Sequence, residues 1–279
     1  MNKILTGALL LLFSSSAAAQ TPRDSIAFAT AQWRTANLGG GAECRYAQID
    51  MFGSRQSISV ATYPGRRFTT SIVHLDRRAE STSDLGKAAA KIAVNGSYFN
   101  VKTFEPVTFV LLDRKIVGRT TPEEAFRTNG VIAFKDRKGR RMEIFPCDTT
   151  QYADVARRYR SALAAGPVLI DGGKVVEYTS GSSFYTRRHP RTLIGKRADG
   201  TVVMAVIDGR FKGQGDGATI AETAYIARQL GLTEALNLDG GGSSTLWTAQ
   251  EGVLNHPYDN RRFDHEGERG VPNCIVVRR

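Results

Sequence analysis

Residues 237–245 read NLDGGGSST and follow an apolar run at 235–238 that is typical of a buried strand. Three consecutive glycines after a strand allow successive backbone N–H groups to converge on an anion, and the serines that follow add hydroxyl donors. A mobile hinge or a tight turn is the alternative interpretation of these glycines. In this loop we predict substrate-binding residues at Gly240, Gly241, Gly242, Ser243 and Ser244.

Carboxylates follow two of the predicted strands. Asp208 comes directly after the run at 202–207, Asp239 comes after the run at 235–238, and each precedes a glycine. A strand fixes the backbone while the next loop can shape a pocket, so these positions suit catalytic groups. We predict that Asp208 and Asp239 form an ionised catalytic pair, with a simple Asp-Gly turn as the alternative at each position.

Glu222 is a third catalytic candidate, and it has two interpretations of equal weight. The spacing from Thr219 to Glu222 is that of a capping box at the start of the helix predicted over 218–230. A role in helix stabilisation would therefore explain Glu222 without any catalysis.

Two arginines are candidates for holding a phosphate. Arg191 follows Pro190, so its side chain should project from the start of a strand, and Arg210 follows the end of the next one. Guanidinium forks fit phosphate better than ammonium groups do, so the two side chains could hold it from two sides. A basic surface stretch is the alternative.

The remaining pattern is rich in strands. Helical spacing of apolar residues predicts helices only over 152–164 and 218–230. Short β-branched runs bounded by turn residues predict strands at 45–51, 57–61, 69–75, 91–94, 107–112, 131–134, 142–145, 168–170, 192–196, 202–207, 235–238, 244–247 and 274–277. The predicted fold class is α+β, with strand-rich mixed sheets and a few packed helices in a single compact domain.

The composition narrows the class of protein. The chain has 279 residues, 41 % of them hydrophobic and 23 % charged, which excludes disorder, collagen-like structure and a disulfide-dense miniprotein. Its 38 Lys and Arg against 27 Asp and Glu give a net charge of +11. The basic residues are spread along the chain without a basic helix or a stacking motif, so we expect no nucleic-acid partner. The scattered histidines argue against a zinc site.

Residues 1–19 have the layout of a secretory signal peptide: a positive start, a short apolar run and small residues before Gln20. We therefore expect an exported protein, periplasmic or extracellular, with no stable membrane insertion after signal cleavage. Residues 20–84 would form a strand-rich segment of the same domain as residues 85–279. Export makes one disulfide possible, and a clasp between Cys44 and Cys274 is plausible, although the sequence does not choose among three pairings.

Several polar and glycine-rich segments follow one another along the chain: 95–99, 164–167, 190–195, 206–210, Glu222, 237–244 and 271–273. From about residue 90 onward, this succession resembles the phosphodiester glycosidase family. The resemblance implies cleavage of a sugar phosphodiester at the anomeric carbon, which releases the sugar and a phosphomonoester. The residues it places on motif positions are Asn95, Arg191, Asp208, Arg210, Glu222, Asp239, Gly240, Gly241, Gly242, Ser243 and Arg269.

The chemistry of that reaction agrees with the residues. A phosphate leaving group needs stabilisation of its negative charge more than it needs a strong acid, and arginines with loop amides provide that stabilisation. We expect Asp239 or Asp208 to act as base or nucleophile, on a sugar-phosphodiester or an anionic envelope glycan. Oxygen ligands at both aspartates would also suit calcium or magnesium. Two alternatives stay open: a non-catalytic envelope sugar-phosphate-binding module, and a phosphodiesterase that cleaves the P–O bond.

Overall fold

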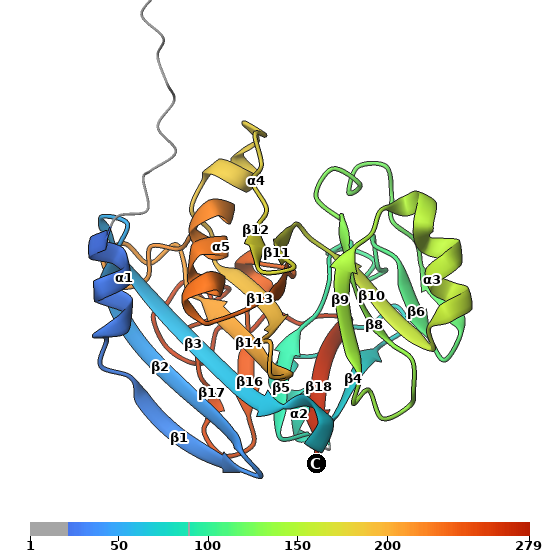
Figure 1. Cartoon of the computed structure of the whole chain (residues 1–279), viewed down its shortest axis with the longest axis horizontal. Helices are drawn as coiled ribbons and strands as arrows, with labels where there is room; N and C mark the ends of the chain where they lie inside the picture. The colour runs from blue at the N-terminus through green and yellow to red at the C-terminus, as the bar shows by residue number, and fades with distance from the viewer. Residues whose placement is uncertain (1–21, 89) are drawn as a thin grey trace, which may run out of the picture.

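The computed structural model describes residues 22–88 and 90–279, and the expected signal peptide at 1–19 lies outside them. Within the described part, the chain folds into three sheets and five short α-helices (Figure 1). The strands predicted from β-branched runs are mostly present, and the α+β, strand-rich class is confirmed. The strands pair antiparallel in all three sheets of this part.

The largest sheet has eight strands and carries most of the candidate residues at its strand ends. In spatial order it contains β1 (Arg34–Gly39), β2 (Ala42–Met51), β3 (Ser54–Pro64), β14 (Thr201–Ile207), β13 (Arg191–Lys196), β15 (Glu234–Asn237), β11 (Val168–Asp171) and β12 (Lys174–Val175). The pairing of β3 with β14 joins the first part of the chain to its second half.

Two five-stranded sheets complete the strand content. One contains β7 (Lys115–Gly118), β6 (Val110–Leu112), β10 (Ser161–Ala165), β8 (Gly130–Phe134) and β9 (Met142–Pro146). The other contains β17 (Gly252–Val253), β16 (Leu246–Thr248), β5 (Ile92–Asn95), β18 (Asn273–Arg278) and β4 (Thr69–His74).

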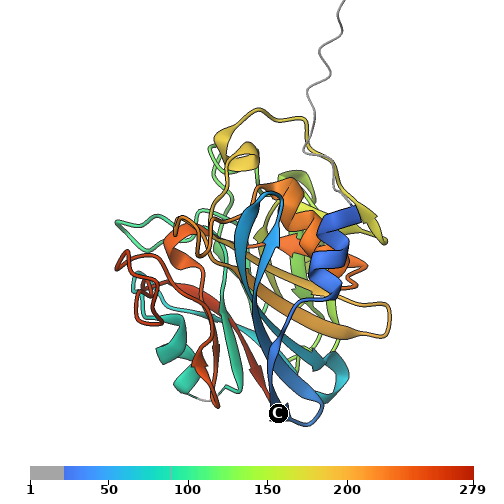
Figure 2. The ribbon, with the colours of Figure 1, turned by 90° about the vertical axis from the view of Figure 1, so that its left-hand side faces the viewer.

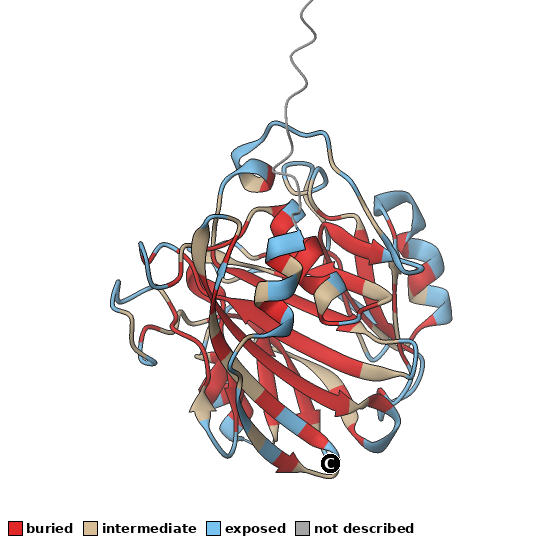
Figure 3. Cartoon of the chain, turned by 60° about the vertical axis from the view of Figure 1, so that its left-hand side comes forward, coloured by how far each residue is buried: buried red, intermediate tan, exposed pale blue. Residues whose placement is uncertain are grey.

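The layers follow from where apolar side chains alternate along the strands. One face of the large sheet packs against both smaller sheets, and this main core includes Tyr63, Leu163 and Ile275. The opposite face of the large sheet is covered by α1 (Pro22–Ala29) and α5 (Ile220–Gln229) (Figure 2). Buried residues accordingly run along the strands of this sheet, whereas the loops around it are largely exposed (Figure 3).

The outer faces of the smaller sheets are covered by one helix each. The short helix α3 (Tyr152–Arg158) packs on the sheet of β10, and α2 (Thr82–Lys87) packs on the sheet of β5. A fifth helix, α4 (Ser183–Thr186), lies in the connection that leads to β13. No helix among the described residues is long and apolar enough to cross a membrane.

The predicted helix over 152–164 is wrong in its second half. The helix α3 ends at Arg158, Tyr159 is extended, and residues 161–165 form β10 between β6 and β8. Apolar residues at helical spacing suggested one long helix, but the pairing of β10 with two neighbouring strands buries this segment better.

None of the three possible disulfide pairings, including the plausible clasp between Cys44 and Cys274, is formed, because all three cysteines are free and buried. The side chains of Cys44, Cys147 and Cys274 belong to three different hydrophobic clusters. They therefore lie in separate layers of the fold.

Candidate active site

The glycine loop, residues 239–244, begins where β15 leaves the centre of the large sheet. Its close packing requires glycine: a Cβ on Gly240 would lie 2.5 Å from the Pro190 carbonyl oxygen, and one on Gly242 would lie 2.1 Å from Asp259 Oδ1. Gly241 has a φ of +64°, in the left-handed region that favours glycine. The loop is therefore a tightly fitted turn rather than a mobile hinge.

The loop amides are largely committed inside the protein. The N–H of Gly240 donates to Asp239 Oδ1 at 2.9 Å, and the N–H of Gly241 donates to the Pro190 carbonyl at 3.0 Å. The N–H groups of Ser243 and Ser244 bond to carbonyls of the loop itself. The predicted convergence of successive amides on an anion is thus not what the structure has, and the arginines beside the loop offer further donors to an anion.

Asp239 is half-buried at the start of this loop. Burial raises the pKa of its carboxyl to about 6, although the Ser243 hydroxyl, Arg127, the Gly240 amide and Arg269 all pull in the opposite direction. A carboxyl that titrates near neutrality can accept a proton from water or a substrate and return it. Asp239 has the environment expected of a general base.

Three arginines surround the glycine loop, and we call them the arginine cluster: Arg127, Arg210 and Arg269. Arg127 and Arg269 both act electrostatically on Asp239. A Cβ on Gly241 would lie 3.3 Å from Arg210 Nη2, and one on Gly242 would lie 2.5 Å from Arg269 Nη2, so both guanidinium groups touch the loop. Arg269 is held by Asp259 at 2.6 Å, and Arg127 by Glu124 at 2.5 Å.

Arg210 is the most accessible member of the arginine cluster. Its side chain is exposed, and its guanidinium lies 5.1 Å from the centre of the Tyr258 ring. Its φ is +70°, a conformation that costs an ordinary residue roughly 1 kcal/mol. Within the described part of the chain, no carboxylate lies at ion-pair distance from it. Its guanidinium is therefore accessible and carries no ion pair to a described carboxylate.

Asp208 lies 1 % exposed beneath the same loops, with its carboxylate saturated by donors. It accepts hydrogen bonds from Ser57 Oγ at 2.6 Å, from His256 N at 2.9 Å and from Asn255 Nδ2 at 3.2 Å. His256 Nδ1 lies at hydrogen-bond distance from Asp208 Oδ2, at 2.8 Å. Asp208 therefore orients an imidazole instead of facing a substrate directly.

Asn255 links the two aspartates through the loop. Its Nδ2 also donates to the Ser244 carbonyl at 2.9 Å, and Ser244 belongs to the glycine loop that Asp239 opens. The glycine that follows each aspartate also packs against Pro190. A Cβ on Gly209 would lie 2.4 Å from the Pro190 nitrogen, and one on Gly240 would lie 2.5 Å from the Pro190 carbonyl oxygen. The start of β13 and the ends of β14 and β15 thus meet at one point.

Three of the predicted site residues have their polar groups turned to the scaffold. Arg191 is buried, and its guanidinium donates to the carbonyls of Ala218 at 2.8 Å and Phe184 at 2.7 Å. Burial lowers its pKa to about 10. Because these bonds direct Arg191 toward α4 and the start of α5, it does not form the expected two-sided phosphate clamp with Arg210.

Asn95 and Glu222 have similar roles. Asn95 donates to the Asp239 carbonyl at 2.7 Å and accepts from Thr192 Oγ1 at 2.9 Å, so it fixes the backbone of the catalytic candidate. Glu222 forms the predicted capping box with Thr219 and also receives two nitrogens of Arg188, the closer at 2.6 Å. The helix-stabilising interpretation of Glu222 accounts for its contacts.

A calcium or magnesium ion, which the sequence left open as a possibility without making it a certain cofactor, does not fit these residues. Within the described part of the chain, no group of three His, Cys, Asp or Glu side chains is arranged to hold a metal. Asp208 is enclosed by hydrogen-bond donors, which a cation would have to displace, and Asp239 already has arginines as its neighbours.

The sequence reasoning missed Arg127 and His256. Arg127 lies in a loop without a glycine cluster, and its guanidinium lies 4.0 Å from the centre of the Tyr98 ring. Tyr98 in turn donates to the Gly166 carbonyl, next to the cis Gly166–Pro167 bond. The histidine follows Asn255 in a segment whose only available signal was the Asn-His-Pro turn. The place of both side chains in the site is set by contacts with segments distant in the sequence, which local patterns do not reveal.

Comparison with known proteins finds a family model and distant relatives. The model of the phosphodiester glycosidase family matches residues 88–278. The N-acetylglucosamine-1-phosphodiester alpha-N-acetylglucosaminidase of Mus musculus is 26 % identical over 200 residues, which are 68 % of this chain and 36 % of that protein. The SPbeta prophage-derived uncharacterized protein YomE of Bacillus subtilis (strain 168) is 38 % identical over 90 residues, 32 % of this chain and 13 % of that protein. The chain therefore spans well under two thirds of either relative.

A solved structure shares the fold. The zebrafish N-acetylglucosamine-1-phosphodiester alpha-N-acetylglucosaminidase catalytic domain, auto-inhibited by its pro-peptide, matches with a TM-score of 0.66 at 16 % identity. The match covers 89 % of this chain and 88 % of that one. Because the family model also matches more than half of the sequence, the chain belongs to the phosphodiester glycosidase family.

Proposed function

We propose that this protein is an exported hydrolase that cleaves the glycosyl–phosphate bond of sugar-1-phosphodiesters. The observation that carries the proposal is Asp239, a half-buried carboxyl whose pKa is raised to about 6 and which lies beside the arginine cluster. A base next to several guanidinium groups suits a reaction in which water attacks carbon while an anionic phosphate departs.

In the proposed reaction the bond between the anomeric carbon and the phosphate oxygen breaks, and its electron pair stays on the phosphate. Arg210 and Arg269 bind this phosphomonoester, because charge-assisted hydrogen bonds stabilise negative charge as it develops. Water adds to the anomeric carbon, and its proton passes to Asp239. Asp208 acts through His256, whose imidazole it orients by the contact at Nδ1.

The proposed substrate is a sugar-phosphodiester, either free or within an anionic envelope glycan. Export is part of the proposal: residues 1–19 would direct secretion and be removed before Gln20, which leaves residues 20–279 as one catalytic domain in the periplasm or outside the cell. Sequencing the N-terminus of the protein from each cell fraction tests this part. A cytoplasmic protein that retains Met1 would contradict it.

The reaction is tested with the mature protein and N-acetylglucosamine-1-phospho-methanol in oxygen-18 water. Label recovered in the sugar supports cleavage at the anomeric carbon. Label recovered in the phosphate would instead establish a phosphodiesterase that cleaves the P–O bond. Binding without turnover would leave a non-catalytic sugar-phosphate-binding module, and either of these two outcomes refutes the proposed reaction.

A further inference from the structure

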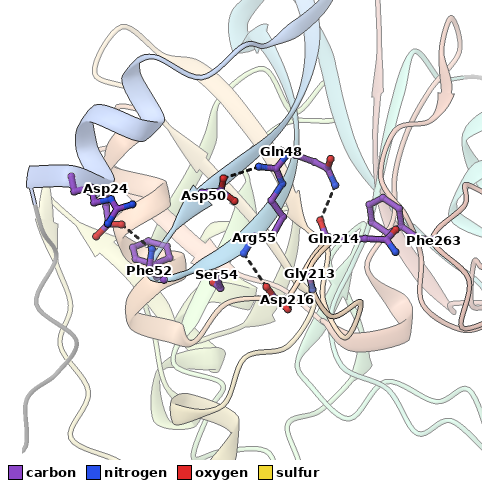
Figure 4. Close-up of a pocket in the computed structure, with 12 residues that line it drawn as sticks. Asp24, Gln48, Asp50, Phe52, Ser54, Arg55, Gly213, Gln214, Asp216 and Phe263 are labelled. Carbon is purple, nitrogen blue, oxygen red and sulfur yellow. Dashed lines mark hydrogen bonds and ion pairs between the residues drawn. The ribbon is translucent and has the colours of Figure 1, made fainter.

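A cavity with a largely polar lining lies beside the candidate active site. It has a volume of about 1070 Å³ and lies between the start of α1, the tip of the β2–β3 hairpin and the loop at 213–216 (Figure 4). Phe263 lies at one end of the lining shown in Figure 4, and its ring stacks on His256. None of Asp239, the glycine loop or the arginine cluster lines it, so the reaction proposed above does not account for this cavity.

The walls of the cavity are held in place by hydrogen bonds. Asp216 Oδ2 accepts from the Arg55 N–H at 2.9 Å, and Asp216 Oδ1 accepts from the Gly213 N–H at 3.0 Å. Gln48 Nε2 donates to the Gln214 carbonyl at 2.8 Å, which ties the loop to β2. A site that is ordered before binding loses less entropy when a ligand enters.

The charge of the lining differs from that of the arginine cluster. Two arginines and three aspartates line the cavity, a formal charge of −1, and Arg55 is already paired with Asp50 at 3.0 Å. A polyanion would meet no net attraction here. The amide oxygen of Gln48, the side chain of Gln214 and the outer oxygen of Asp50 instead offer donors and acceptors suited to hydroxyl groups.

An aromatic wall connects the cavity to the site of phosphate binding. The Phe263 ring lines the cavity and stacks on His256 at 3.6 Å and 8°. Phe211 packs edge-on against both Phe263 and Tyr258, at 5.3 Å from each ring centre, and Tyr258 lies under Arg210. Aromatic rings with polar neighbours bind the apolar faces of sugars well.

We propose that this cavity binds a neutral oligosaccharide, namely the glycan part of the substrate that extends from the phosphodiester. The inference rests on the proposed function for the identity of the substrate, but the binding of sugars can be measured by itself. The arginine cluster takes the phosphate, and the cavity takes the uncharged sugars that adjoin it. This division makes the protein an enzyme for glycan chains rather than for small sugar phosphodiesters alone.

The test uses two variants at one position. Gln214→Trp fills the cavity, and Gln214→Ala removes the side-chain amide while keeping the backbone carbonyl that Gln48 binds. The matched control is Gln250→Trp, at an exposed position in the turn between β16 and β17. Binding of three neutral tetrasaccharides, made of glucose in α or β linkage or of N-acetylglucosamine, is measured by calorimetry and NMR with the mature protein.

We expect at least one tetrasaccharide to bind the parent protein and Gln250→Trp equally. Gln214→Trp should weaken that binding at least tenfold, and Gln214→Ala should weaken it less. Hydrolysis of N-acetylglucosamine-1-phospho-methanol should stay at the parent rate in all three variants, because their substitutions lie outside the site of reaction.

The proposal is overturned if no tetrasaccharide binds the parent, or if Gln214→Trp binds as well as the parent does. Inorganic tripolyphosphate serves as the anionic probe. If tripolyphosphate binding is lost in Gln214→Trp but not in Gln250→Trp, the cavity is an anion site and the proposal is likewise refuted. An inactive parent that still binds sugar in this cavity would refute the proposed hydrolase while leaving the binding site intact.

Discussion

Replacing Asp239 by asparagine should separate catalysis from stability. Asparagine has nearly the same shape and can still accept the hydrogen bond that the Gly240 N–H donates at 2.9 Å, but it cannot take a proton. Loss of a general base usually lowers kcat about 10²- to 10⁴-fold. We expect a loss in that range for Asp239→Asn, with little change in KM because the arginine cluster is untouched.

The same substitution should make the folded protein more stable at alkaline pH. The pKa of Asp239 is raised from 3.8 to about 6, so the ionised carboxylate is disfavoured in the folded state. Stability is therefore greatest when the group is protonated and falls as the pH rises from about 4 to 6. The full shift corresponds to about 3 kcal/mol, which solvent screening of a half-buried group reduces to about 1–2 kcal/mol.

Urea unfolding of the parent and Asp239→Asn at pH 5 and pH 8 measures this effect, and turnover of the phosphodiester is followed over the same pH range. The asparagine variant should gain stability over the parent at pH 8 and gain less at pH 5. For the parent, kcat/KM should rise as the pH increases through about 6. An unchanged turnover rate, or an asparagine variant that is less stable at pH 8, would refute the role of Asp239 as a desolvated base.

Three further outcomes are expected. Arg210→Ala should raise KM for the phosphodiester by about tenfold or more, because a charge-assisted hydrogen bond to the phosphate is lost. The unfolding temperature of the variant should change little, because the side chain is exposed. A normal KM would contradict phosphate binding by Arg210. Glu222→Gln weakens the contact with Arg188 and should cost about 1–2 kcal/mol in urea unfolding, with kcat per folded molecule unchanged; a large loss of kcat at full stability would restore the catalytic interpretation. Unfolding in denaturant should release three titratable thiols per chain without reductant, since all three cysteines are free; a single thiol would show a disulfide.

The features that the sequence predicted well are those that neighbouring residues determine. The capping box at Thr219 and Glu222 depends on a spacing of three residues within one helix, and the structure contains it. Runs that end in Asp-Gly at 208 and 239 mark strand ends, and their backbones do leave the large sheet there. The convergence of these ends could be predicted because a sheet brings its strand ends to shared edges.

The features that it predicted poorly depend on contacts between distant segments. A guanidinium in isolation looks like a phosphate ligand, but Arg191 finds carbonyl acceptors from α4 and the start of α5, which no local pattern reveals. His256 acquires its role only because Asp208, 48 residues away, lies against it. Residues 161–165 become a strand because two partner strands are available on either side.

The polar residues of the motifs therefore divide into two groups: those that border the proposed site of reaction, such as Asp239 and Arg210, and those that bond to the scaffold. Asn95, Arg191 and Glu222 satisfy their hydrogen bonds inside the protein: Asn95 fixes the Asp239 carbonyl at the start of the glycine loop, whereas Arg191 and Glu222 fix the backbone that leads into α5. Rigidity is what allows a half-buried carboxyl to remain beside the arginine cluster without relaxing toward it and returning to an ordinary pKa. A looser loop would let Asp239 form a close ion pair with Arg269 or Arg127, and that pairing would lower its pKa and weaken it as a base. In the proposed reaction, Asn95 would therefore matter through the position of Asp239 and not through contact with the substrate.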